Sequence, residues 1–424
     1  MKKIIELLQQ NPQVNDWRIL ENSTESYELF FIHDQLETVR KTDTCTCTVT
    51  VYVDHQDFRG NSTFTVYASD TPDDLAAKIQ SACAKAALVC DRPYALPSEG
   101  TLKAKLPSNL EGRAMSEIAA EVGRAVLAAG HLPTGGINAL EVFVKKTTVH
   151  VQNSRGIDKE QVRHSVAIEA IPTYNGEKES VELYEYYDLS TLDLADLSAK
   201  IKGRMQDVSA RGVATRPTEG ISCPVLLTAG ELRNLFGTLA YDRGFYDAYA
   251  HTNLLSPGDL LQTDPQGDRI TITMRDHVEG SPAGSYFDAD GIALVPCTVI
   301  KDGKVVANFG GSRFAQYLGC EPTGELPICQ VDGGATPEAA LRAVPHLECV
   351  YMSGLQVDTY SDYIGGEVRL AYYFDGTRRI PLTGISISAK LSHVLNHLRL
   401  SSETTVQGRY AGPAAALLEG FNIF

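Results

Sequence analysis

The chain has 424 residues, of which 43% are hydrophobic and 21% charged, the composition of an ordinary folded protein. This length exceeds what one simple core needs, so two or three domains are expected. The 38 basic and 53 acidic residues give a formal net charge of −15, which argues against nucleic-acid binding. No window approaches the roughly 18 uncharged apolar residues of a membrane-spanning helix, so no membrane association is expected.

The first ten residues predict an amphipathic helix rather than a signal peptide. Glu6 and Gln9 interrupt the apolar residues, and no small-residue cleavage site follows. The nine cysteines are odd in number, and no two of them stand in a C-x-x-C spacing. We therefore expect reduced thiols in a cytoplasmic protein.

A sheet with a helix is predicted for residues 1–95. The alternation at 44–53 predicts a half-buried strand, with Cys45 and Cys47 on its apolar face. Further strands are predicted at 27–33 and 64–68. The segment 69–74 then supplies a cap, a proline and acidic residues for a helix that runs to about Cys90.

The same order recurs in residues 115–215. Strands are predicted at 140–144, 162–171 and 181–186, and Ser190–Asp193 caps a helix with apolar residues at helical spacing. We therefore expect two related N-terminal α/β units, each an antiparallel sheet with helices. The proline-rich segment 92–107 is the expected connector between them.

Residues 222–424 have a different pattern of predicted elements from the residues before them. Short strands alternate with turns rich in Gly and Asp, which predicts a β-rich C-terminal domain with a sandwich or barrel-like core. The expected fold class of the whole chain is therefore α+β, with two α/β units followed by this β-rich domain.

The histidines provide little metal-binding potential. None of the ten is followed by Glu, so neither H-E-x-x-H nor H-E-x-x-x-H is present. His393 and His397 stand four residues apart on a predicted helix and could reach one ion. No carboxylate or cysteine lies in the same turn, so a solvated or partner-facing surface is favoured over a metal site. Asp288 and Asp290 are interpreted as a turn with side-chain-to-backbone hydrogen bonds rather than as an acid–base pair.

The C-terminal half contains an apolar strand and an amphipathic helix at 223–242, then Gly284–Gly291, Tyr351–Gln356, and Pro381–Ser386 before a helix at 389–398. This order of motifs resembles the TldD/TldE (PmbA) family of bacterial peptidase subunits. In TldD-type subunits H-E-x-x-x-H lies on the first of these helices, and the corresponding residues here are Leu232, Arg233 and Gly237. A further cysteine ligand of the family would lie within 401–413, which contains no cysteine.

The resemblance therefore implies a TldE/PmbA-like subunit with no catalytic residue, metal ligand or cofactor of its own. It would act with a TldD-like catalytic subunit, which supplies zinc, in a heterodimeric peptidase for small or unfolded peptides, or form a homodimer without that partner. Family roles include peptide maturation and proteolysis, and older names call members modulators of DNA gyrase. Two alternatives stay open: a hydrolase with an unrecognised site, and a stand-alone peptide-binding or scaffold protein.

Overall fold

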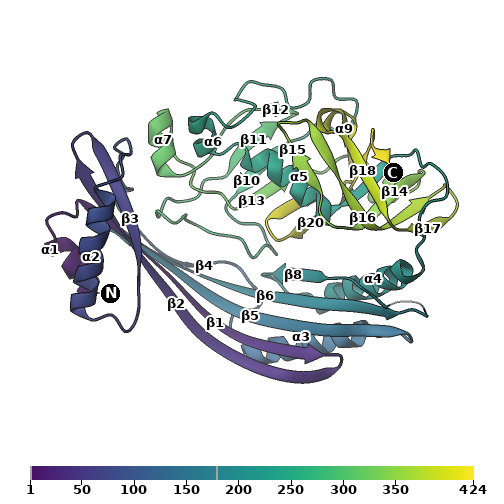
Figure 1. The fold of residues 1–424 in the computed structure, drawn as a ribbon, viewed down its shortest axis with the longest axis horizontal. Coiled ribbons are helices and arrows are strands. Elements are labelled where there is room, and N and C mark those ends of the chain that lie inside the picture. Colours follow the sequence, from purple (N-terminus) through teal and green to yellow (C-terminus); the bar gives the residue numbers. More distant parts are fainter. Residues whose placement is uncertain (1, 178–179) are drawn as a thin grey trace.

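The computed structural model describes residues 2–177 and 180–424. Its N-terminal half contains one long sheet with the strand order β3-β2-β1-β5-β6-β4. All neighbours in this order are antiparallel except β4, which runs parallel to β6. The short strands β7 and β8 also pair with β6. The strands are β1 (Asp16–Ile32), β2 (Gln35–His55), β3 (Phe58–Val66), β4 (Gly100–Lys105), β5 (Gly135–Asn153), β6 (Ile157–Asn175), β7 (Ser180–Glu182) and β8 (Glu185–Leu189). The sheet is curved, and its concave side faces the C-terminal domain (Figure 1).

Each predicted N-terminal unit contains a helix, a long hairpin, shorter strands and a second helix. The helices are α1 (Lys2–Gln10), α2 (Pro72–Ala86), α3 (Met115–Ala129) and α4 (Leu194–Val213). β1 pairs with β5 along almost its whole length, so the two units share one sheet. Their division into separate domains at 1–95 and 115–215 therefore stays a prediction.

Three sequence expectations in this half need correction. The strands are longer than predicted, because β1 and β2 form a ladder from Asp16/Tyr52 to Ile32/Gln35. The expected connector at 92–107 contains β4, which pairs in parallel with β6. Cys45 is exposed, and only Cys47 is buried on the apolar face of β2.

The helix ends follow local side-chain chemistry. Thr71 caps α2 in a capping box with Asp74, and Asp193 caps α4 by accepting hydrogen bonds from two backbone N–H groups. α2 ends at Ala86 instead of the expected Cys90 because the chain turns back toward β2. There His55 Nε2 lies 2.8 Å from the carbonyl oxygen of Val89.

The C-terminal domain contains two sheets with α5 between them, since α5 contacts strands of both. The first sheet has the order β12-β11-β10-β13-β21-β20, and the second has the order β19-β22-β9-β14-β16-β18-β23, with β15 and β17 also paired to β16. The first consists of β10 (Ile272–Arg275), β11 (Cys297–Lys301), β12 (Lys304–Val305), β13 (Ile328–Val331), β20 (Thr404–Gln407) and β21 (Tyr410–Pro413). The second consists of β9 (Val225–Thr228), β14 (His346–Met352), β15 (Gln356–Asp358), β16 (Tyr363–Phe374), β17 (Arg379–Leu382), β18 (Ile385–Lys390), β19 (Arg399–Leu400), β22 (Ala415–Leu418) and β23 (Asn422–Ile423). The predicted α+β class with a β-rich C-terminal domain is confirmed.

Helices in this domain are short apart from α5. They are α5 (Ala229–Tyr241), α6 (Phe245–Ala250), α7 (Ser312–Leu318), α8 (Glu338–Leu341) and α9 (Leu391–His397). Across the described residues, no helix is both long and apolar enough to cross a membrane.

One contact between the two halves is a small apolar cluster with polar neighbours. Phe287 packs against Val151 and Ile157 of the sheet. Beside it, Gln161 donates a hydrogen bond to Ser285, and Arg18 pairs with Asp290. Asp288 accepts hydrogen bonds from the backbone N–H groups of Asp290 and Ile292, as the turn interpretation predicted. This contact, together with others such as the ion pair of Arg313 with Asp91, holds the C-terminal domain over the concave side of the sheet.

Candidate functional site

Helix α5 presents one face to the core and another to the surface. Leu232 is fully buried in the main core of the C-terminal domain, whereas Arg233 is exposed and Gly237 is partly exposed. A Cβ atom at Gly237 would meet only the ring of Tyr241, at 3.9 Å. These three positions offer an alkyl group, a guanidinium and no side chain, so they do not fit zinc, which binds thiolate, imidazole and carboxylate.

The stretch 401–413 lies against this helix. Phe236 of α5 stacks on Tyr410 with ring centroids 6.4 Å apart, and the β20–β21 hairpin contacts α5 along its length. The structure therefore brings together the helix and the segment in which the family resemblance places metal ligands. Neither contains a histidine or a cysteine.

The two histidines of α9 stack on each other. The rings of His393 and His397 have centroids 4.1 Å apart and an angle of 24° between their planes. His397 Nδ1 also lies 2.8 Å from the carbonyl oxygen of His393, so this nitrogen donates to the backbone. Within the described residues, no group of three or more His, Cys, Asp or Glu side chains is arranged to hold a metal ion.

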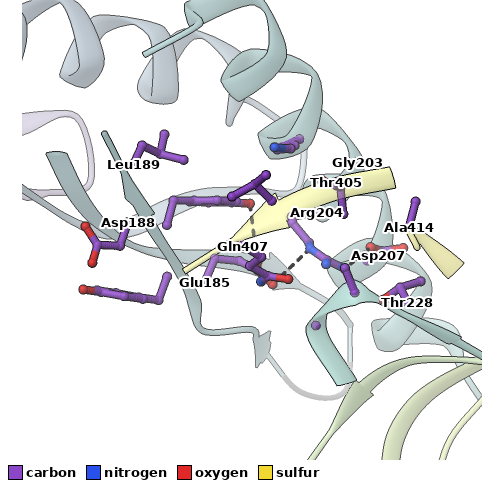
Figure 2. Close-up of a pocket in the computed structure, with 16 residues that line it drawn as sticks. Glu185, Asp188, Leu189, Gly203, Arg204, Asp207, Thr228, Thr405, Gln407 and Ala414 are labelled. Carbon is purple, nitrogen blue, oxygen red and sulfur yellow. Dashed lines mark hydrogen bonds and ion pairs between the residues drawn. The ribbon is translucent and has the colours of Figure 1, made fainter. Parts of the chain in front are cut away.

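A pocket of about 290 Å³ lies where the N-terminal end of α5 meets the N-terminal half of the chain. Figure 2 shows its walls, which come from β8, α4, the β9–α5 junction and β20. Thr228, Gly230 and Gln407 line the pocket from the C-terminal domain. Glu185 and Asp188 line it from the N-terminal half of the chain. The pocket therefore lies beside the α5 helix and the hairpin that packs on it.

Arg204 forms the charged wall of this pocket. Its guanidinium lies 3.1 Å from Glu185 and 2.9 Å from Asp207 (Figure 2). Asp207 also accepts a hydrogen bond from Tyr372 at 3.0 Å. Burial raises the pKa of Glu185, while Arg204 opposes that rise. Two carboxylates therefore pair with Arg204, which joins α4 to β8, while Asp207 joins α4 to Tyr372 of the C-terminal domain.

These pocket residues were not predicted from the sequence. The alternation in β8 indicates that Glu185 and Tyr187 share one face while Asp188 lies on the other. The spacing of Arg204 and Asp207 is compatible with a helical ion pair. Neither pattern indicates that α5 and β20 complete the pocket, because these elements are distant in the sequence.

The comparisons with known proteins agree with this architecture. Residues 221–423 match the family described as the PmbA/TldA metallopeptidase C-terminal domain. No curated protein matches the sequence significantly.

Solved structures resemble the chain over its whole length. TldE from Thermococcus kodakarensis has a TM-score of 0.82 and 15% identity, covering 100% of this chain and 99% of that one. A candidate modulator of DNA gyrase from Bacteroides thetaiotaomicron has a TM-score of 0.81 and 14% identity, covering 100% and 97%. Another from Thermotoga maritima has a TM-score of 0.79 and 14% identity, covering 100% and 99%. At these identities the structures establish the fold alone.

Proposed function

We propose that the chain, whose residues 221–423 match the PmbA/TldA metallopeptidase C-terminal domain, is the TldE/PmbA-like, non-catalytic subunit of a zinc-dependent peptidase. Its partner is a TldD-like chain that carries the zinc and the general base. The substrates are small or unfolded peptides. This chain supplies scaffold and binding surface.

One observation carries the proposal: the site scaffold is present without metal-binding side chains. Helix α5 and the 401–413 segment pack together, yet Leu232, Arg233 and Gly237 provide no zinc ligand. A zinc hydrolase of this type needs imidazole or carboxylate groups that reach one ion and an adjacent base for the bound water. A metal-dependent hydrolase with an unrecognised site is less well supported, because the described residues contain no three-ligand cluster.

Peptide binding is supported by an edge strand at the pocket. β20 ends the order of its sheet, and Thr405, Val406 and Gln407 of this strand line the pocket. Peptides of diverse sequence can pair with such an edge through main-chain hydrogen bonds, which do not depend on side chains. We therefore place the peptide-binding surface along β20, at the pocket between this strand and β8.

Co-expression with a TldD-like chain from the same genome tests this function. We expect the two chains to co-elute in size-exclusion chromatography, and the pair to cleave an unfolded test peptide faster than the TldD-like chain alone. An H-E-x-x-x-H-disrupted partner should still co-elute but show no cleavage.

Three results would contradict the proposal. Equal cleavage by the TldD-like chain without this protein would remove the subunit role. Cleavage by this chain alone, retained after chelation, would favour the hydrolase alternative. Peptide binding without any association with the TldD-like chain would favour the stand-alone scaffold.

A further inference from the structure

A second cavity adjoins the first. It has a volume of about 520 Å³ and lies between β6 and the loop that follows β10. Ser190 lines it, and the preceding residue, Leu189, lines the first pocket, so the two spaces share one wall. Arg163, Arg275 and Gln330 also line this cavity.

Arg163 lies on the concave side of the sheet. Gln161, two residues earlier on the same strand face, donates a hydrogen bond to Ser285 of the C-terminal domain. Arg163 forms no ion pair within the part of the chain that the structure describes. Burial lowers the pKa of Arg163, and the cation of Arg409 lowers it further, whereas Asp188 opposes both.

Arg275 faces the same cavity from the C-terminal domain. Its Nε atom is buried and has no hydrogen-bond partner among the described residues. The carboxylate of neighbouring Asp276 is already 2.7 Å from His277 Nδ1. Glu279 also lines the cavity, but its side chain is exposed. The cavity thus contains two guanidinium groups that lack the carboxylate partners on which buried arginines usually depend.

We propose that Arg163 and Arg275 form a binding site for a carboxylate group of a peptide. The planar guanidinium fork matches a carboxylate, and a group bound there would satisfy the buried Nε atom of Arg275. That the ligand is a peptide rests on the proposed function. The carboxylate can be the carboxyl terminus or an Asp or Glu side chain.

Fluorescence anisotropy with the full chain, without partner, tests this site. The probes are an alanine–glycine hexapeptide with an uncharged dye at its amino terminus and a free carboxyl terminus, the same peptide amidated, and an amidated version with one internal Glu. Arg163→Gln and Arg275→Gln are compared with Arg124→Gln, which removes an exposed arginine of α3. Circular dichroism verifies the fold of each variant, and Arg275→Lys retains the charge without the fork.

We expect at least one carboxylate-bearing probe to bind about tenfold or more tightly than the uncharged amide, the effect of a charge-assisted hydrogen-bond pair. The Gln variants should abolish that preference, Arg275→Lys should restore part of it, and Arg124→Gln should leave it unchanged. Preference for the free terminus or for the internal Glu identifies the carboxylate.

Equal binding of all three probes would overturn the carboxylate site while leaving peptide binding in place. A preference that survives both Gln variants would also overturn it. If no probe binds, the carboxylate site is rejected, and co-elution with the TldD-like chain still decides the proposed function independently.

Discussion

His150 connects three strands of the N-terminal sheet through one imidazole. Its Nε2 atom lies 2.6 Å from Asp158 on β6, and its Nδ1 atom lies 3.4 Å from Glu21 on β1. The hydrogen bond to Glu21 raises the pKa of His150 most, burial opposes the rise, and Asp158 adds to it, giving a value of about 9. The side chain is therefore a cation at neutral pH and is paired on both sides.

Replacing this residue should produce a pH-dependent loss of stability. Because the folded-state pKa exceeds the unfolded value of about 6.5, the stabilisation is complete below pH 6.5 and is lost as pH rises through about 9. His150→Gln should lower the free energy of unfolding by about 1 kcal/mol at pH 6, since solvent screens this partly exposed group, and by less at pH 10. Urea titrations at both pH values measure this, with His131→Gln on the surface as control. A pH-independent difference would contradict the assignment.

The helices α4 and α5 contain glycines whose surroundings differ sharply. A Cβ atom at Gly237 would meet only Tyr241 at 3.9 Å, whereas at Gly212 it would lie 2.3 Å from the ring of Tyr174. Gly237→Ala should therefore stabilise the protein by about 0.5–1 kcal/mol, since alanine is the better helix former. Gly212→Ala should destabilise it by about 1–3 kcal/mol through overpacking. Thermal unfolding compares the two, and a loss of stability in Gly237→Ala would show that this position is packed.

Among helices and strands, the hydrophobic pattern of the sequence predicts an element best when one face of that element is buried and the other is exposed. The apolar stripe of α5 corresponds to real burial, so this helix was predicted correctly. At 44–53 the predicted strand is present, but Thr50 and Tyr52, on the face opposite Cys47, are buried as well. Residues 35–41 of β2 are exposed throughout, so no hydrophobic pattern extends the strand there. β4 was missed because its parallel pairing with β6 joins segments more than 50 residues apart.

The candidate site could be predicted only in part, because its elements are also distant from one another in the sequence. The replaced residues on α5 could be identified from their order along the chain. The contacts between the two halves could not be identified in this way. The hydrogen-bonded residues Tyr372 and Asp207 are 165 residues apart in the sequence, and Gln161 and Ser285 are 124 residues apart. Local periodicity carries no information on such contacts. The cavity with Arg163 and Arg275 is accordingly visible only in the folded molecule.

The whole chain should bind no stoichiometric zinc. Leu232 and Gly237 lack donor atoms, and the stacked rings of His393 and His397 have no third ligand among the described residues. Elemental analysis after chelation and zinc reloading should therefore find far less than one zinc per chain, and chelation should leave the melting temperature unchanged. About one zinc per chain that disappears in His397→Ala would contradict this expectation.

The two halves of the molecule should loosen locally when the apolar contact at Phe287 is removed. Phe287 is only 2% exposed and packs on Val151 and Ile157, so Phe287→Ala should cost about 3 kcal/mol at this junction. Hydrogen exchange should rise at the β5–β6 turn and in residues 286–294, while α5 stays protected because its core is separate. Phe245→Ala, a buried aromatic within the C-terminal domain, is the matched control and should leave the β5–β6 turn unchanged. If Phe287→Ala instead raises exchange equally throughout both halves, they unfold as one cooperative unit and the contact is not an independent junction.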